Sequence, residues 1–249
     1  MQNGKSEEFW LDRLKDGVHT VELPYDKPKL KHNRFTGRVE EHSFSSELTA
    51  DIREMALANK TTMANLLLTV FTIMLNKVTG QEQIDLAVSI ANRENPDLTR
   101  MIGFFANLII LKTDFSADHE LDKLIEMTHT QMLEASDHQS YPFDLLVQKL
   151  NPERENLFNP LINVVFSFNQ FDRKDYSYNS GIERDEDMLS VSPFLDSSNH
   201  ISSKFDMILF AVERQGNIEL TMEYNDSLFK PTTIARYLKY IEKIFLSIL

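Results

Sequence analysis

Residues 63–90 read MANLLLTVFTIMLNKVTGQEQIDLAVSI and contain the two elements that decide the fold. Within residues 63–78 apolar side chains recur every three or four positions, and further apolar residues lie on the opposite side. This pattern predicts a helix in the protein interior, and Gly80 is placed to end it. Ile84–Ile90 is a short, branched apolar run that is typical of a buried strand.

The same two periodicities predict the other elements along the chain. Helices are expected at residues 48–56 with Ser45 or Ser46 as the cap, 121–135, 144–150 and 234–248 beyond Pro231, and strands at residues 107–112, 161–168, 205–213 and 218–224, the last two as a hairpin. Interleaved helices and strands predict one layered α/β lobe, with a mixed β-sheet flanked by helices, over residues 1–249. Within it, residues 1–45 form a lead-in segment, and the polar residues 172–203 form a surface excursion with some local strand.

Composition restricts the classes of partner. The 249 residues include 42% hydrophobic and 26% charged residues, which suits a globular core, and 26 Lys and Arg against 38 Asp and Glu give a net charge of -12. Such a charge repels phosphate backbones and anionic lipid, so no nucleic-acid or membrane partner is expected. The basic residues between Lys27 and Arg34 are either a solvated linker or a docking patch for an acidic partner.

The location also follows from composition. The chain has no cysteine, so it offers no disulfide, thiolate metal site or cysteine nucleophile, and a reducing compartment fits. Residues 1–15 lack the basic start and apolar run of a signal peptide, and polar residues interrupt the apolar run at residues 63–78 before it reaches about 20 residues. A cytoplasmic protein is therefore expected.

Three spaced phrases carry a more specific signal. They are MIGFFANL at residues 101–108, HQSYPFD at residues 138–144 and RENLFNPL at residues 154–161. Together they resemble the second half of a nonribosomal peptide synthetase condensation domain, whose pattern is approximately I-G-x-F-V-N-T, H-Q-x-x-P-F-E and R-D-x-S-x-N-P-L. Further phrases in matching order extend the resemblance over nearly the whole chain: FWL at residues 9–11, LPYD at 23–26, KFD at 204–206 and YN at 224–225.

This resemblance implies the fold and the reaction. The fold is the C-terminal lobe of two chloramphenicol-acetyltransferase-like halves that enclose a tunnel. In the family, donor and acceptor are thioesters on the phosphopantetheine arms of carrier proteins, and the acceptor amine attacks the donor thioester to form an amide. The implied partners are the N-terminal lobe, the peptidyl or acyl carrier proteins and the adjacent synthetase domains. No cofactor is expected to bind this chain directly.

The catalytic motif of that family, H-H-x-x-x-D-G, is missing from this chain. The seven histidines include no adjacent pair. We therefore expect the isolated chain to be inactive, with an apolar surface built to be covered by its partner half. A noncatalytic scaffold for carrier proteins, or half of a heterocyclising or epimerising relative, remains the alternative.

Four residues are implied as tunnel residues: Ser89, Arg93, Gly103 and Asn107. Gly103 could equally form a tight turn into a strand, and Asn107 could satisfy its amide in the core. The alternative for Arg93 is an ion pair with a neighbouring carboxylate, Glu94 or Asp97. The chain departs from the family pattern at two positions, where Asn92 replaces the usual glycine and Leu108 the usual threonine.

The other two phrases are expected to be architectural. Pro142 and Phe143 can cap and anchor the following helix, and His138 is expected to bond a backbone group rather than to act in catalysis. Arg154, Asn159 and Pro160 are expected to end that helix and turn the chain into a strand.

A metal site is not expected. Glu126 and His129 have a spacing that can ligate metal on a helix, but no second matching pair follows them, so they are interpreted as a solvated face.

Overall fold

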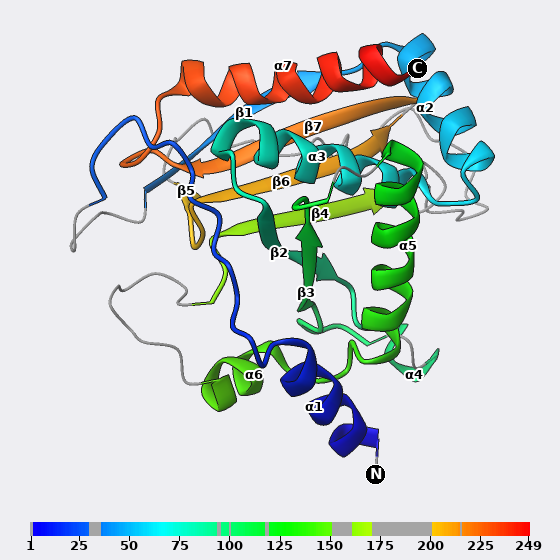
Figure 1. Ribbon diagram of the computed structural model, residues 1–249, viewed down its shortest axis with the longest axis vertical. Coiled ribbons are helices and arrows are strands. Elements are labelled where there is room, and N and C mark those ends of the chain that lie inside the picture. The colour runs from blue at the N-terminus through cyan, green and yellow to red at the C-terminus, as the bar shows by residue number, and fades with distance from the viewer. Residues whose placement is uncertain are drawn as a thin grey trace, which may run out of the picture.

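The computed structural model describes residues 2–29, 36–93, 96–99, 101–117, 120–150, 161–170, 201–214 and 216–249. Its elements interleave along the chain as expected (Figure 1). In order they are α1 (Gln2–Arg13), β1 (Thr36–Ser43), α2 (Ser46–Ala58), α3 (Met63–Thr79), β2 (Gln83–Ile90), α4 (Pro96–Thr99), β3 (Asn107–Asp114), α5 (Leu121–Asp137), α6 (Phe143–Leu150), β4 (Val164–Gln170), β5 (Ile201–Ser202), β6 (Met207–Arg214), β7 (Asn217–Asn225) and α7 (Pro231–Ile248).

The strands form one seven-stranded sheet in the order β3-β2-β4-β6-β7-β1-β5. β4 pairs in parallel with β2 and with β6, whereas the other neighbours pair antiparallel. The predicted mixed sheet is therefore confirmed. Figure 1 shows β2 and β3 running across the direction of β4, β6 and β7.

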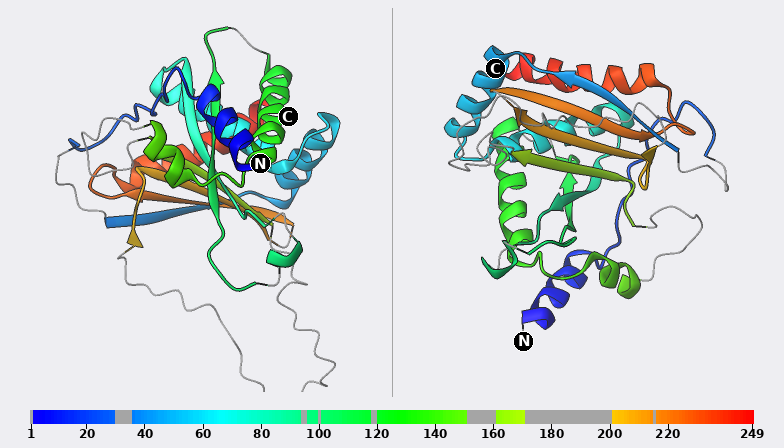
Figure 2. Two further views of the ribbon diagram at one scale, coloured as in Figure 1. Left: turned by 90° about the horizontal axis from the view of Figure 1, so that it is seen from below. Right: turned by 180° about the vertical axis from the view of Figure 1, so that it is seen from behind.

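Helices α3, α5 and α7 cover one face of the sheet, with α3 packed against both of the others (Figure 1). From behind, β4, β6, β7 and β1 lie in front of α3 and α7 (Figure 2). The predicted alternation in β7 agrees with this arrangement, because Ile218, Leu220, Met222 and Tyr224 are all fully buried on the helix side. The core therefore lies between this sheet face and the three helices.

The predicted interior helix is confirmed as α3. Its ten buried residues include both sides of the helix, so neighbours surround it. The Thr62 hydroxyl accepts a hydrogen bond from Asn65 N, and Gly80 ends the helix in the left-handed region at φ 72°. Of the two caps expected for α2, Ser45 is the one that accepts from a helix amide, Leu48 N.

The lead-in segment contributes structure that the sequence did not predict. It contains α1 and β1, and β1 pairs with β7 over seven residues. Between them, residues 17–29 are bonded to the sheet. His19 N donates to Asp85 Oδ2 at 2.7 Å, Val21 N donates to Asn163 Oδ1 at 3.0 Å, and Asp26 Oδ2 accepts from Lys230 N at the start of α7 at 2.8 Å.

Asp206 is the centre of this attachment. Its Oδ2 accepts hydrogen bonds from the Tyr25 hydroxyl at 2.7 Å, from Lys29 Nζ at 3.0 Å and from Asn163 Nδ2 at 3.1 Å. The Asp206 side chain is 1% exposed. Burial, together with this carboxylate, raises the pKa of Tyr25, so Tyr25 remains a proton donor to it.

The expected surface excursion lies mostly outside the described residues. Its end contains the two-residue strand β5, which pairs with β1 at Thr36 and Gly37. Among the described helices none is by itself long and apolar enough to cross a membrane. Only α2 and α3 taken together meet that test, and they are bent by 102° relative to each other.

We predict that Asp206→Ala lowers the free energy of unfolding by about 2 kcal/mol, because the half-buried Tyr25 hydroxyl and the buried Asn163 amide lose their shared acceptor. Urea unfolding followed by circular dichroism measures this loss. Asp12→Ala is the matched control, since its ion pair with Lys15 is exposed and should change stability little. Equal stability of the two variants would contradict the role given to Asp206.

Candidate functional site

The site begins where β2 and β4 separate. β3 pairs with β2 along all eight residues of β2, and β6 pairs with β4 along all seven residues of β4. β2 and β4 pair with each other only from Ala87 opposite Val165 to Ser89 opposite Ser167. Beyond this short ladder the carboxyl ends of the two strands diverge, which leaves space between them.

A cavity of about 580 Å³ occupies this space. The ends of β2 and β4 supply most of its wall, and α3, α5 and the start of the loop before α6 supply the rest. Its lining residues are Ala64, Asn65, Leu68, Val88, Ser89, Ile90, Ala91, Asn92, Arg93, Ala106, Met132, Gln139, Phe166, Ser167, Phe168 and Asn169.

The lining suits a neutral ligand that carries amide or hydroxyl groups. Apolar and aromatic side chains alternate with hydroxyls and side-chain amides, and Arg93 is the only charged residue among the described ones in the wall. A hollow with this lining is chemically suited to an uncharged ligand. It presents no carboxylate or imidazole from the described residues, so this wall lacks a side chain suited to general base catalysis at neutral pH.

Arg93 is engaged by the loop that follows α4. Its guanidinium donates to the carbonyl oxygens of Leu98, of Met101 at 2.9 Å and of Gly103 at 3.1 Å. It also lies over the Phe105 ring, 4.4 Å from the ring centroid. Arg93 therefore holds this loop in place from the edge of the cavity.

Gly103 allows the Phe105 ring to approach the backbone closely, and any larger residue would force the ring to shift. A Cβ atom at residue 103 would lie 2.9 Å from the Phe105 ring. The same loop points apolar side chains outward, because Met101, Ile102 and Phe104 are 51%, 104% and 94% exposed. The loop is thus fixed on its inner side by Arg93 and presents a bare apolar surface on its outer side.

Asn107 joins two of the three phrases recognised in the sequence. Its Nδ2 donates to the carbonyl oxygens of Gln139 at 2.9 Å and Tyr141 at 2.7 Å, and its Oδ1 accepts from Phe143 N at 3.0 Å. Asn107 lies next to the cavity and does not line it. Gln139, whose carbonyl accepts a hydrogen bond from Asn107, is one of the lining residues.

His138 has a different partner from the one expected. Its Nδ1 lies 3.1 Å from the Ser6 hydroxyl, so the expectation that the ring bonds a backbone group is wrong. The ring also stacks on Phe9 with centroids 4.0 Å apart, and the His138 carbonyl accepts from Trp10 Nε1 at 3.0 Å. Because the sequence did not predict α1, the contact between His138 and Ser6 in that helix could not be predicted either.

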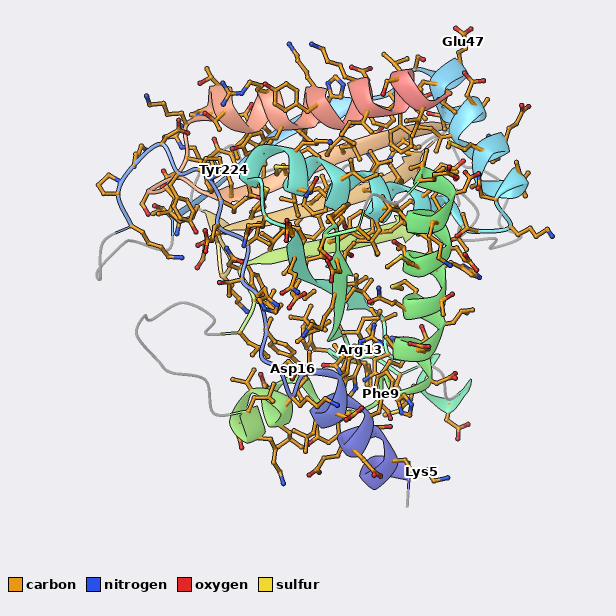
Figure 3. The ribbon with its side chains drawn as sticks, viewed as in Figure 1. Lys5, Phe9, Arg13, Asp16, Glu47 and Tyr224 are labelled. Carbon is orange, nitrogen blue, oxygen red and sulfur yellow. The ribbon has the colours of Figure 1, made fainter. Side chains whose placement is uncertain are left out.

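Helix α1 also contacts the two helices on either side of this loop, α5 and α6. Figure 3 shows Phe9 and Arg13 between α1 and the lower part of α5, where Arg13 pairs with Glu134 at 3.1 Å. On its other side, Glu7 pairs with Lys149 of α6 at 3.0 Å. The hydrogen bond from Lys149 lowers the pKa of Glu7, so Glu7 stays charged at neutral pH.

The phrase around Pro142 forms the start of α6. The Pro142 carbonyl accepts from Leu145 N and Leu146 N in the first turn of α6, and Phe143 is buried at the start of that helix. Arg154, Asn159 and Pro160 lie outside the described residues.

The solvated-face interpretation of Glu126 and His129 is correct for Glu126 only. Glu126 is exposed and pairs with Lys123 at 2.7 Å. His129 is half-buried, and its Nδ1 lies 3.0 Å from Asn65 Nδ2. Within the described parts of the chain, no group of three or more potential ligands is arranged to hold a metal ion.

Sequence reasoning found part of the cavity. Of the four residues that the resemblance implied as tunnel residues, Ser89 and Arg93 line the cavity, whereas Gly103 and Asn107 lie beside it. It missed Asn65 and Met132 on the helices. The available signal for Asn65 was a polar residue in a helix predicted to be interior, which needs a specific hydrogen-bond partner.

Both the family model and the curated relatives that match this chain indicate the condensation domain family. The family model described as "Condensation domain" matches residues 1–249. Surfactin synthase subunit 2 of Bacillus subtilis (strain 168) is 31% identical over 240 residues, which are 96% of this chain and 6% of that protein. Bacitracin synthase 1 of Bacillus licheniformis is 30% identical over 244 residues, which are 96% of this chain and 4% of that protein. The chain thus spans less than a tenth of these relatives.

Solved structures share the fold. A four-domain nonribosomal peptide synthetase matches with a TM-score of 0.83 at 20% identity, over 97% of this chain and 19% of that one. The condensation domain from the Monacolin K polyketide synthase MokA matches with a TM-score of 0.79 at 19% identity, over 98% of this chain and 57% of that one. An epimerization domain from tyrocidine synthetase B also matches, with a TM-score of 0.71 at 17% identity, over 99% of this chain and 57% of that one.

We predict that Arg93→Ala increases backbone hydrogen exchange in residues 101–106 by roughly tenfold, because the loop loses the donor for two of its carbonyls, those of Met101 and Gly103. Exchange followed by mass spectrometry measures this. Arg214→Ala is the matched control, since Arg214 pairs with Glu219 at the surface of the β6–β7 hairpin. An unchanged loop in Arg93→Ala would contradict the role assigned to the guanidinium.

Proposed function

The chain belongs to the condensation domain family, and we propose that it is the C-terminal lobe of an amide-forming condensation domain in a nonribosomal peptide synthetase. The observation that carries this proposal is the family match over residues 1–249, combined with coverage of only 57% of a solved condensation domain chain. The part of that condensation domain chain that this chain does not match is large enough to form a second lobe. The cavity between β2 and β4 is then this lobe's part of the reaction site.

The reaction joins two carrier-bound substrates. The acceptor's amine nitrogen attacks the carbonyl carbon of the donor's acyl or peptidyl thioester. The amide bond forms, the carbon–sulfur bond breaks, and the leaving thiolate takes up the amine proton to become a free thiol. Phosphopantetheine enters this scheme as the arm of each carrier protein, with no cofactor held by the chain itself.

This lobe binds and orients while its partner supplies the base. The neutral lining of hydroxyls, amides and aromatic rings fits the thioester and amide groups of such substrates, and Ser89 and Arg93 are in position to form its wall. The family's H-H-x-x-x-D-G motif does not occur in this sequence, which has seven histidines and none adjacent to another. The chain alone is therefore expected to be inactive.

The partner lobe is expected to cover the loop that Arg93 holds. Met101, Ile102 and Phe104 are more than half exposed, which is unusual for large apolar side chains on one short loop. A rigid loop with an apolar outer surface suits a permanent contact with the other half of the domain. Carrier proteins and adjacent synthetase domains complete the proposed assembly.

The alternatives share the fold. Epimerization and cyclization domains match this chain with TM-scores of 0.71 and 0.72, so the architecture serves several reactions. A noncatalytic scaffold for carrier proteins would also use a wall without a general base. Product analysis separates these possibilities.

We predict that the chain forms amide product only when it is mixed with an N-terminal lobe that contains H-H-x-x-x-D-G. Two loaded carrier proteins, one bearing an acyl thioester and one an aminoacyl thioester, provide the substrates, and mass spectrometry of the carriers detects transfer. Amide formation by the chain alone would contradict the proposal. A stable complex of the two lobes that binds carriers without product would favour the scaffold.

A further inference from the structure

We propose that Asn107 is a positioning residue: its side-chain amide fixes the loop of residues 138–143, so that Gln139 forms one wall of the cavity and His138 receives α1. Its relevance to catalysis rests on the proposed function of the cavity, but the positioning itself is a property of the chain alone. The role differs from direct contact with substrate.

The hydrogen bonds of Asn107 account for both amide protons. Nδ2 has two of them, and the carbonyls of Gln139 and Tyr141 accept one each, at 2.9 and 2.7 Å. Oδ1 accepts from Phe143 N at 3.0 Å. One side chain thus binds the backbone at three points within five residues, and no amide proton is left for a substrate.

The position of Asn107 gives these bonds a rigid base. Asn107 is the first residue of β3 and pairs with Ile90, the last residue of β2. The cavity wall at the end of β2 and the loop that carries Gln139 are therefore tied to each other through Asn107. Asn107 does not itself line the cavity. Replacing its side chain should therefore move Gln139 relative to Ser89 and Arg93, although every lining residue keeps its own side chain.

The loop that Asn107 holds also contacts α1. His138, next to Gln139, stacks on Phe9, bonds Ser6 and accepts from the Trp10 indole at 3.0 Å. Trp10 is 2% exposed and is the only tryptophan in the chain. Its indole is therefore a built-in reporter for the loop, although Trp10 and Asn107 have no hydrogen bond in common.

The test compares the variants Asn107→Ala and Asn107→Asp with the control Asn169→Ala. Asn169 lies near the end of β4 and lines the cavity, so the control removes the same kind of side chain at a different place. The first readout is Trp10, by fluorescence emission and the indole resonance. The second is hydrogen exchange in residues 138–143, with residues 84–88 of β2 as the internal reference for global stability.

Both Asn107 variants should expose Trp10 to quenchers and raise exchange in residues 138–143 by roughly tenfold or more relative to β2. Asp has the volume of Asn but places an oxygen against the carbonyls of Gln139 and Tyr141, so it separates hydrogen bonding from packing. Asn169→Ala should leave both readouts as in the wild type. Asn107 variants that match Asn169→Ala, or an Asp variant that matches the wild type, would overturn the proposal.

A measurement on the unaltered chain remains decisive if the variants fail to fold. The side-chain NH₂ protons of Asn107 should exchange at least roughly tenfold more slowly than those of the exposed Asn169. Equal exchange at the two amides would overturn the proposal. Because these experiments need no partner lobe or substrate, their failure is distinct from a failure to form product.

Discussion

The short ladder between β2 and β4 is the constraint on which the rest of the site depends. Three residue pairs, from Ala87 with Val165 to Ser89 with Ser167, hold the β3–β2 pair to the other five strands. A longer ladder would close the space between the strand ends with backbone hydrogen bonds. A shorter one would weaken the link between the two parts of the sheet, because each parallel pair stabilises slightly less than an antiparallel pair.

Polar side chains secure the geometry around this opening. Arg93 binds the carbonyls of the loop on one side, and Asn107 binds the loop of residues 138–143 on the other. Both side chains bond the backbone of a loop, so replacing either one removes several hydrogen bonds from that loop at once. The phrases that identify the family therefore describe how loops are held at least as much as what touches a substrate.

The sequence predicted the elements whose burial follows a simple period. The helix α3 and strands β2 and β7 carry clear apolar patterns, and Ser45 and Gly80 mark helix ends through local chemistry. Helix α1 escaped prediction because its polar sequence, which contains Gly4, is stabilised by tertiary contacts to His138. Strand β1 escaped because it reads TGRVEEHS, with few apolar residues, and lies beside the two-residue edge strand β5.

The candidate site was harder to predict for the same reason. Ser89 and Arg93 could be placed from one contiguous phrase, but the cavity also uses Asn65 and Met132, which are brought there by packing of α3 and α5. The partners of Asn107 lie more than thirty residues away, and hydrogen bonds of that range follow from tertiary structure rather than from a local pattern.

The account makes the cavity the part of the reaction site that this lobe supplies, and filling it tests that claim most directly. In a domain restored with its N-terminal lobe, Ser89→Phe should reduce amide formation by roughly 100-fold while the circular dichroism spectrum stays the same. Ala58→Phe, in a separate hollow between α2 and the C-terminus, is the matched control and should retain activity. Wild-type rates in a folded Ser89→Phe domain would contradict the account.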